Sequence, residues 1–226
     1  MRTNDYFDNN FRNYNDDDNR FRLGNKVLYK LVEDYPSNTN YDEIVAKFWI
    51  IGRTYAAAIE RRSNKDDTPG DFYYDYVAPT IANSELESRI NDIKNANYSE
   101  ITEDVLKKIL SVHGYLVNLI KGITGKEKRS LASKYLHFHL PNLVFIYDSR
   151  VASVIGKFIQ GNTKGLDIDE EWDSVYARFA YKAFEIYKKL KDDGFASAHG
   201  DTLPRVVDSF LLRYCDEHNV DTAAEE

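Results

Sequence analysis

The sequence predicts an all-α protein built as a multi-helix bundle, and three observations indicate this class. Apolar residues recur at intervals of three and four along most of the 226-residue chain, which is the spacing of one helix face. Prolines and glycines separate these apolar segments, as they separate helices. Hydrophobic residues make up 42% of the chain and charged residues 30%, a balance in which burial can offset the entropy of folding.

The composition also limits the classes of function. A single cysteine, Cys215, permits neither an intrachain disulfide nor a cysteine metal cluster, which fits a reducing cytoplasm. No apolar run approaches the roughly 20 residues of a membrane span, and the N-terminus lacks the apolar core of a signal peptide. The net charge of −7 disfavours a broad grip on phosphate backbones but allows a local basic patch. We therefore expect a soluble, cytoplasmic protein with no membrane partner.

The chain divides into three parts. Residues 1–25 are rich in Asn and Asp and have no sustained period, so they are expected to form a loosely ordered arm. Residues 26–219 carry the periodic segments and are expected to form one helical unit. Residues 220–226 are expected to be an acidic, fraying tail.

The first half of the helical unit contains three predicted helices. The first spans residues 26–35 and stops at Pro36, whose ring and missing N–H end a helix. The second is a long buried helix whose apolar stretch runs through residues 44–59 and which ends at Arg61-Arg62-Ser63, with Asn40 as a plausible cap. A polar loop and an aromatic cluster then lead to a helix at residues 83–93.

The second half begins with a predicted helical hairpin. One helix opens at Ser99 and continues to Gly122, and a second runs from about residue 128 to 140, where Pro141 closes it. The apolar run 143–147 is too short for a helix.

Three further helices are predicted after this apolar run. Asp148 can cap the first, which spans residues 149–159. Helices at residues 170–190 and 203–217 complete the bundle.

Three segments carry a resemblance to a known superfamily. Gly122-Ile-Thr-Gly125 is followed by Ser130-Leu-Ala-Ser-Lys134 and then by Phe145-Ile-Tyr-Asp148-Ser-Arg-Val151. Together they resemble the helix-hairpin-helix DNA glycosylases, particularly the 8-oxoguanine glycosylase branch. Residues 204–211 also look like a segment of uncharacterised bacterial relatives of that fold, and within it Asp208 can pair with Arg205 at helical spacing. The resemblance implies a helix-hairpin-helix, glycosylase-like arrangement of the bundle.

The resemblance implies catalytic roles for two residues. Asp148 matches the aspartate that activates the nucleophile and stabilises the oxocarbenium-like sugar after the base has flipped into an aromatic pocket. Bifunctional members use a lysine at the start of the second hairpin helix to form a Schiff base and cleave the strand. Ser130 stands at that position here, so Lys128 is the candidate for any lyase step.

The other candidate residues are expected to bind substrate or phosphate. The resemblance implies that the turn at Gly122 and Gly125 presents N–H groups to a phosphate. A basic cluster in the hairpin can contact phosphates or can simply be a solvated face; its members are Lys121, Lys126, Lys128, Arg129 and Lys134. Arg53 can face a ligand or pair with a carboxylate. The remaining binding candidates are Lys126, Arg129, Lys134, Tyr147, Arg150 and His137.

No cofactor or metal is expected. His137 and His139 lie two residues apart on a predicted helix and point about 200° apart, so they cannot both bind one metal there.

Three functions stay open. The first is an N-glycosylase, a hydrolase of base-excision DNA repair that acts on a damaged or modified purine in nucleic acid. The second is a catalytically inactive module that binds a nucleotide or a protein, of the kind found beside bacterial anti-phage genes. The third is a purely structural helical interaction protein.

Overall fold

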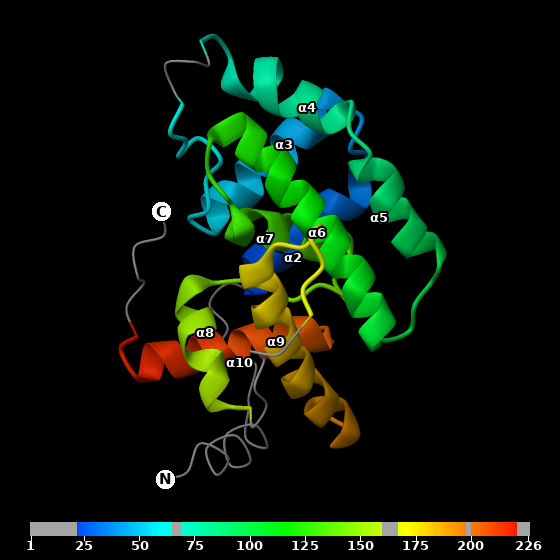
Figure 1. The fold of residues 1–226 in the computed structure, drawn as a ribbon, viewed down its shortest axis with the longest axis vertical. Coiled ribbons are helices and arrows are strands. Elements are labelled where there is room, and N and C mark those ends of the chain that lie inside the picture. Colours follow the sequence, from blue (N-terminus) through cyan, green and yellow to red (C-terminus); the bar gives the residue numbers. More distant parts are fainter. Residues whose placement is uncertain (1–21, 65–68, 160–166, 198–199, 221–226) are drawn as a thin grey trace.

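The computed structural model describes residues 22–64, 69–159, 167–197 and 200–220. Within these ranges the chain forms helices joined by loops and contains no strand, which confirms the predicted all-α class. Figure 1 shows α2 to α7 gathered in one half of the molecule and α8, α9 and α10 in the other. None of the helices in the described ranges combines the length and apolar character needed to cross a membrane.

The described chain before residue 100 contains four α-helices and one π-helical segment. Their bounds are α2 (Arg22–Asp34), α3 (Tyr41–Thr54), the π-helix η3 (Phe72–Val77), α4 (Ala78–Ala82) and α5 (Leu86–Asn95). The described chain after residue 100 contains α6 (Glu103–Thr124), α7 (Arg129–His139), α8 (Ser149–Val154), the short 3-10 helix η4 (Ile155–Lys157), α9 (Ser174–Asp192) and α10 (Leu203–Glu217).

The predicted boundary of the N-terminal arm at residue 25 is wrong. Helix α2 already begins at Arg22, and Asn25 is buried on it. The Asn25 side chain accepts a hydrogen bond of 2.6 Å from the hydroxyl of Tyr55, which lies 30 residues further along the chain. This tertiary contact holds the first turn of α2 in place. The rest of the predicted arm, residues 1–21, lies outside the described residues, as does the tail from residue 221.

Helix α3 ends at Thr54, well before the predicted end at Arg61-Arg62-Ser63. The Ala56 N–H donates to the Arg53 carbonyl at 3.3 Å and the Ala57 N–H to the Gly52 carbonyl at 2.8 Å. This pair of bonds is a Schellman motif, in which one residue must adopt the left-handed conformation. Ala56 does so, with φ of 53°. Ala58 and Ile59 beyond it are buried in the loop that follows α3. Their apolar character therefore indicates burial and does not indicate that the helix continues.

Replacing Ala56 with glycine is expected to stabilise the protein by about 0.5–1 kcal/mol, because a Cβ atom is penalised in the left-handed region. Urea denaturation of the wild type and the A56G variant measures this difference. Ala96→Gly is the matched control, since the exposed Ala96 caps α5 with an ordinary helical φ of −70°. The control should be neutral or destabilising, and an equal gain in both variants would contradict the assignment of strain to Ala56.

The aromatic cluster, for which the sequence predicted no regular structure, is helical. Asp71 caps η3 by accepting hydrogen bonds from the Tyr73 and Tyr74 N–H groups, at 3.0 Å and 3.1 Å. The segment buries Phe72 and Val77 and continues directly into α4. The aspartate cap is a sequence signal, but the aromatic run has no 3.6-residue period to accompany it.

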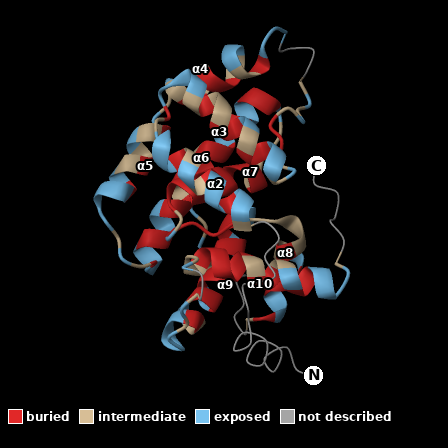
Figure 2. Cartoon of the chain, turned by 180° about the vertical axis from the view of Figure 1, so that it is seen from behind, coloured by how far each residue is buried: buried red, intermediate tan, exposed pale blue. Residues whose placement is uncertain are grey.

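The predicted helical hairpin is confirmed as α6 and α7. Thr102 caps α6, and Gly125 ends it in the left-handed conformation with φ of 70°. Every residue of α7 from Ser130 to His139 is buried. Helix α7 contacts α2, α3 and α6 and is the central helix of its half of the fold. In Figure 2 the buried residues lie along α7 and on the facing sides of its neighbours.

The apolar run 143–147 is a buried, non-helical connection between α7 and α8, as predicted. Asp148 caps α8, since its Oδ1 accepts a 3.0 Å bond from the Arg150 N–H. Helix α8 is shorter than predicted and passes into η4 after Val154. Helix α9 begins at Ser174, not at residue 170, because Asp173 provides its cap by accepting from the Tyr176 N–H at 2.7 Å.

Candidate functional site

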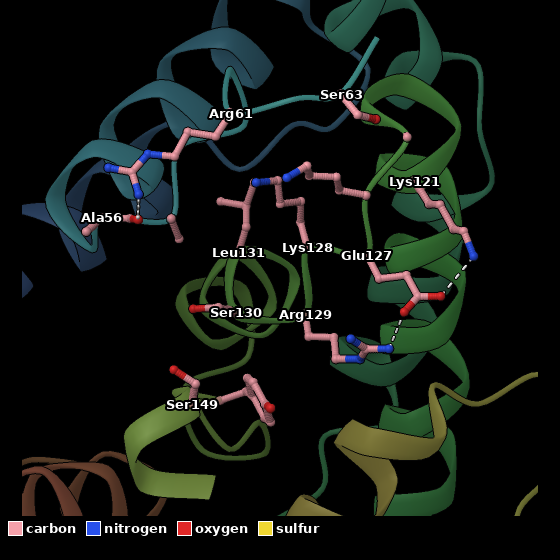
Figure 3. Close-up of a pocket in the computed structure, with 14 residues that line it drawn as sticks. Ala56, Arg61, Ser63, Lys121, Glu127, Lys128, Arg129, Ser130, Leu131 and Ser149 are labelled. Carbon is pink, nitrogen blue, oxygen red and sulfur yellow. Dashed lines mark hydrogen bonds and ion pairs between the residues drawn. The ribbon is translucent and has the colours of Figure 1, made fainter. Parts of the chain in front are cut away.

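A cationic groove of about 700 Å³ lies between the loop that follows α3 and the turn that joins α6 to α7. The start of α7 and the segment just before α8 complete it. Five of its lining residues are basic and one is acidic. Figure 3 shows these side chains, and the full lining is Ala56, Ala57, Arg61, Ser63, Lys121, Gly125, Lys126, Glu127, Lys128, Arg129, Ser130, Leu131, Tyr147 and Ser149.

The two glycines of the predicted phosphate-binding turn have different positions. Gly122 lies inside α6 and does not line the groove, whereas Gly125 does. The Gly125 N–H donates to the Lys121 carbonyl at 2.8 Å, and the Lys126 N–H donates to the Thr124 hydroxyl at 3.1 Å. These N–H groups are engaged within the turn, so a phosphate in the groove would meet the side chains of the turn first.

Lys126 and Lys128 both line the groove, as the predicted phosphate-binding cluster requires. Arg61 joins them from the opposite wall and was missed by the sequence analysis, where Arg61 marked only a helix end. Its guanidinium donates to the Ala56 carbonyl at 3.3 Å, and Figure 3 shows it directed away from the hairpin side of the groove.

Glu127 bridges two of the basic residues. Its Oε1 lies 2.8 Å from the Lys121 Nζ, and its Oε2 pairs with the Arg129 Nη2. The hydrogen bond from Lys121, assisted by the charge of Arg129, lowers the pKa of the Glu127 carboxyl, so the bridge is ionic at neutral pH. The second partner of Arg129 is Asp173, whose carboxylate lies 2.8 Å from Nε.

Lys134 lies beneath the floor of the groove. Its Nζ hydrogen-bonds to the hydroxyl of Ser130, which lines the groove, and lies 3.3 Å from the Tyr147 carbonyl oxygen. The Lys134 side chain is only 3% exposed. Lys134 therefore contacts Ser130 and Tyr147 of the groove from inside the protein, and it is not a surface side chain that contacts a phosphate directly.

Asp148 sits between two residues that line the groove, Tyr147 and Ser149. Besides capping α8, its Oδ1 lies 3.8 Å from the Arg150 Nε. Arg150 also pairs with Asp216 of α10 at 3.0 Å. Both side chains are about one-quarter exposed, at 28% for Arg150 and 26% for Asp148. The structure thus confirms the capping role of Asp148, while its catalytic role stays a prediction.

His137 is part of a buried hydrogen-bond chain and does not line the groove. The Arg205 Nε donates to the Tyr29 oxygen at 3.1 Å, and the Tyr29 hydroxyl lies 2.6 Å from the His137 Nε2. The His137 Nδ1 lies 2.8 Å from the Val144 carbonyl, which can only accept, so Nδ1 carries the proton. Arg205 also forms the predicted pair with Asp208, at 3.1 Å. This chain holds the connection that leads to Asp148.

Arg53 pairs with Glu60, whose Oε1 lies 2.6 Å from the Arg53 Nη2. Of its two predicted alternatives, the carboxylate pair is therefore the one observed. Arg53 does not line the groove.

The described fold and site define a helical protein with a cationic groove at an α-hairpin. Residues 4–143 match the family model HI_0787_N, which is described as an N-terminal domain. These 140 of 226 residues are more than half of the chain, so the protein belongs to the HI_0787_N family. Comparisons with curated proteins and with solved structures give no match. The family match includes α2 to α7 and ends just before Asp148.

Proposed function

We propose that this protein binds nucleic acid or a nucleotide in the cationic groove and acts there as an N-glycosylase on a damaged or modified purine. One observation carries the proposal: Tyr147 and Ser149, the chain neighbours of Asp148, line the same groove as Lys126 and Lys128. Asp148 itself is not among the lining residues, so its carboxylate would have to turn from the α8 cap towards the groove to act there. The third function left open by the sequence, a purely structural protein, requires no such groove.

Binding would rest on charge and stacking. Lys126 and Lys128 would neutralise phosphates and release counterions, although the whole chain is acidic. Tyr147 offers an aromatic ring at the groove floor, where an extruded base could stack.

The reaction would use Asp148 as the central carboxylate. Water attacks the sugar C1′ as the C1′–N bond breaks, and the departing base takes the electron pair of that bond. Asp148 accepts the proton of the attacking water, and its negative charge stabilises the oxocarbenium-like transition state. A small movement of the Arg150 side chain would release the carboxylate for this role.

A lyase step would need an amine near the sugar, and two lysines are candidates. Lys128 lines the groove directly, at the cap of α7. Lys134 reaches the groove floor from one turn further along α7, with its Nζ against the Ser130 hydroxyl. Ser130 occupies the position of the lysine in the family that the sequence resembles, so Lys134 brings an amine close to that point.

The test is base release from a labelled duplex carrying 8-oxoguanine, with and without hot alkali. Asp148→Asn is expected to slow release of the nucleobase by about 100-fold or more. The asparagine keeps the shape of the α8 cap but cannot accept the proton of the attacking water as the carboxylate does. Asp216→Asn is the matched control, since Asp216 also pairs with Arg150 but lies on α10, away from the groove-lining residues Tyr147 and Ser149 that flank Asp148. Equal activity in the wild type and the D148N variant would contradict the proposed role.

The lyase step has its own readout in the same assay. Borohydride trapping of an abasic duplex, compared between Lys128→Gln and Lys134→Gln, identifies the lysine that forms the Schiff base. Loss of trapping in one variant alone assigns the amine to that residue.

A catalytically inactive nucleotide- or protein-binding module is the second candidate. It is favoured by the engagement of Asp148 with the α8 cap and Arg150, and by the serine at position 130. Wild-type protein that binds the duplex but releases no base, from 8-oxoguanine or other lesions, would support this candidate.

A further inference from the structure

Among the described residues that line the cationic groove, Glu127 is the acidic one, and it lies between two of the cations. Figure 3 shows its carboxylate directed to Lys121 on one side and to Arg129 on the other. Each carboxylate oxygen has one cationic partner. A phosphate presents the same feature, two anionic oxygens on one centre, to a lysine and an arginine.

Arg129 would keep its position if Glu127 moved away. Asp173 holds its Nε edge with both carboxylate oxygens at 2.8 Å. Asp173 is itself fixed, because its side chain is 7% exposed and caps α9. The Nη2 group of Arg129, which now meets Glu127, would therefore stay directed to the same point in the groove. Such a pre-organised guanidinium loses little conformational freedom when it binds an anion.

We propose that Lys121 and Arg129 form a phosphate subsite of the groove, and that Glu127 occupies it until a phosphate displaces its carboxylate. This inference rests on the proposed function in assigning the phosphate to nucleic acid or a nucleotide. The subsite itself depends only on the three side chains and can be tested with inorganic pyrophosphate.

Glu127 would then set the selectivity of the groove. A phosphate must displace Glu127 from Lys121 and Arg129 before it can form its own two ionic contacts with them. A loosely placed phosphate backbone therefore gains little binding free energy from this exchange. A ligand that is already held at Lys126 and Lys128 presents its neighbouring phosphate at a high effective concentration and displaces Glu127 more readily. Glu127 would thus favour ligands that are already bound at Lys126 and Lys128 over ligands that meet the groove non-specifically.

The experiment compares Glu127→Gln with wild type in binding a short fluorescein-labelled duplex over a range of salt concentrations. E127Q is expected to bind about tenfold tighter at low salt, with a logarithmic salt slope steeper by about 1–2, because two cations become available to phosphates. Adding Lys121→Gln to E127Q should remove about one unit of that slope. Glu185→Gln is the matched control, since Glu185 pairs with Lys188 on α9 outside the groove lining and changes the net charge equally.

Pyrophosphate supplies the second readout, because it needs only the subsite. It is expected to raise the unfolding temperature of E127Q more than that of wild type or E185Q. A selective pyrophosphate effect without duplex binding would support the subsite and remove nucleic acid from the proposed function. No selective gain for E127Q with either ligand would overturn the subsite, whatever the base-release assay shows. A gain in duplex affinity with an unchanged salt slope would also contradict it.

Discussion

Acidification from about pH 7 to about pH 5 is expected to unfold this protein or bring it close to unfolding, because three buried histidines must stay neutral. His113, His137 and His139 are all buried. Burial lowers the pKa of His113 to about 4, and lowers the pKa of His137 and His139 well below the usual range. The unfolded chain therefore binds these protons first, and the free energy of unfolding falls as the pH drops below about 6.5.

Asp208 acts in the opposite direction. Burial raises its pKa to about 6, so the folded chain takes up this one proton before the unfolded chain does. On acidification the unfolded chain binds three protons, at the histidines, that the folded chain does not bind. The folded chain binds one proton, at Asp208, that the unfolded chain does not bind, so the unfolded state binds two more protons than the folded state. Each proton changes the free energy of unfolding by about 1.4 kcal/mol per pH unit, so the net loss is about 2.7 kcal/mol per pH unit. This loss is large against a typical total stability of about 5–15 kcal/mol.

Urea midpoints measured at several pH values between about 7 and 5 test the expectation. His139→Gln isolates one of the three histidines, since neither ring nitrogen of His139 has a hydrogen-bond partner among the described residues. This variant should flatten the pH dependence by about one proton. A midpoint that stays constant over the range would show that the three histidines can be protonated in the folded state.

Gly114→Ala is expected to destabilise the protein by about 3 kcal/mol or more, because nothing can move aside cheaply for the added methyl group. A Cβ atom on Gly114 would lie 2.1 Å from the Glu171 carbonyl oxygen and 3.1 Å from the Asp173 nitrogen. Both are backbone atoms, so no side-chain rotation relieves the contact. Helix α6 must separate from the segment 171–173, which carries the aspartate that holds Arg129.

Gly122→Ala is the matched control on the same helix. Apart from the adjoining backbone of α6, no atom of the described residues lies within 4 Å of the position that a Cβ would take there. This substitution should therefore stabilise the protein by about 0.5–1 kcal/mol, the ordinary preference of a helix for alanine over glycine. Thermal unfolding of the two variants gives the comparison. Equal effects would mean that the approach of residue 171 to α6 is not needed for folding.

The Gly114 variant also has a consequence in the groove. Displacement of Asp173 would free Arg129 from its 2.8 Å contact and loosen the partner of Glu127. Close packing at Gly114, well before the hairpin turn in the chain, thus supports the geometry of a charged side chain in the groove. G114A should weaken any binding that depends on Arg129, even under conditions in which the variant remains folded.

Local sequence signals determined most of the helices. The hairpin α6 and α7, the cap at Asp148 and helix α10 follow from apolar spacing, capping residues and glycine at a helix end. These signals act between residues only a few positions apart, so they can be read without knowing the fold. The predicted Arg205–Asp208 pair belongs to the same group, because its two members are three residues apart on one helix.

Only the tertiary structure decided which charges face the groove and which are held. Arg129 meets Asp173, 44 residues further along the chain, and Lys134 lies under the floor of the groove instead of on a surface. Ala56 ends α3 inside an apolar run because the chain folds back there. By itself, the sequence determined most of the helices and several of their caps, and its match to a family model gives the family to which the chain belongs. The burial and pairing of individual side chains depend on neighbours distant in sequence, which is why the fold alone settled them.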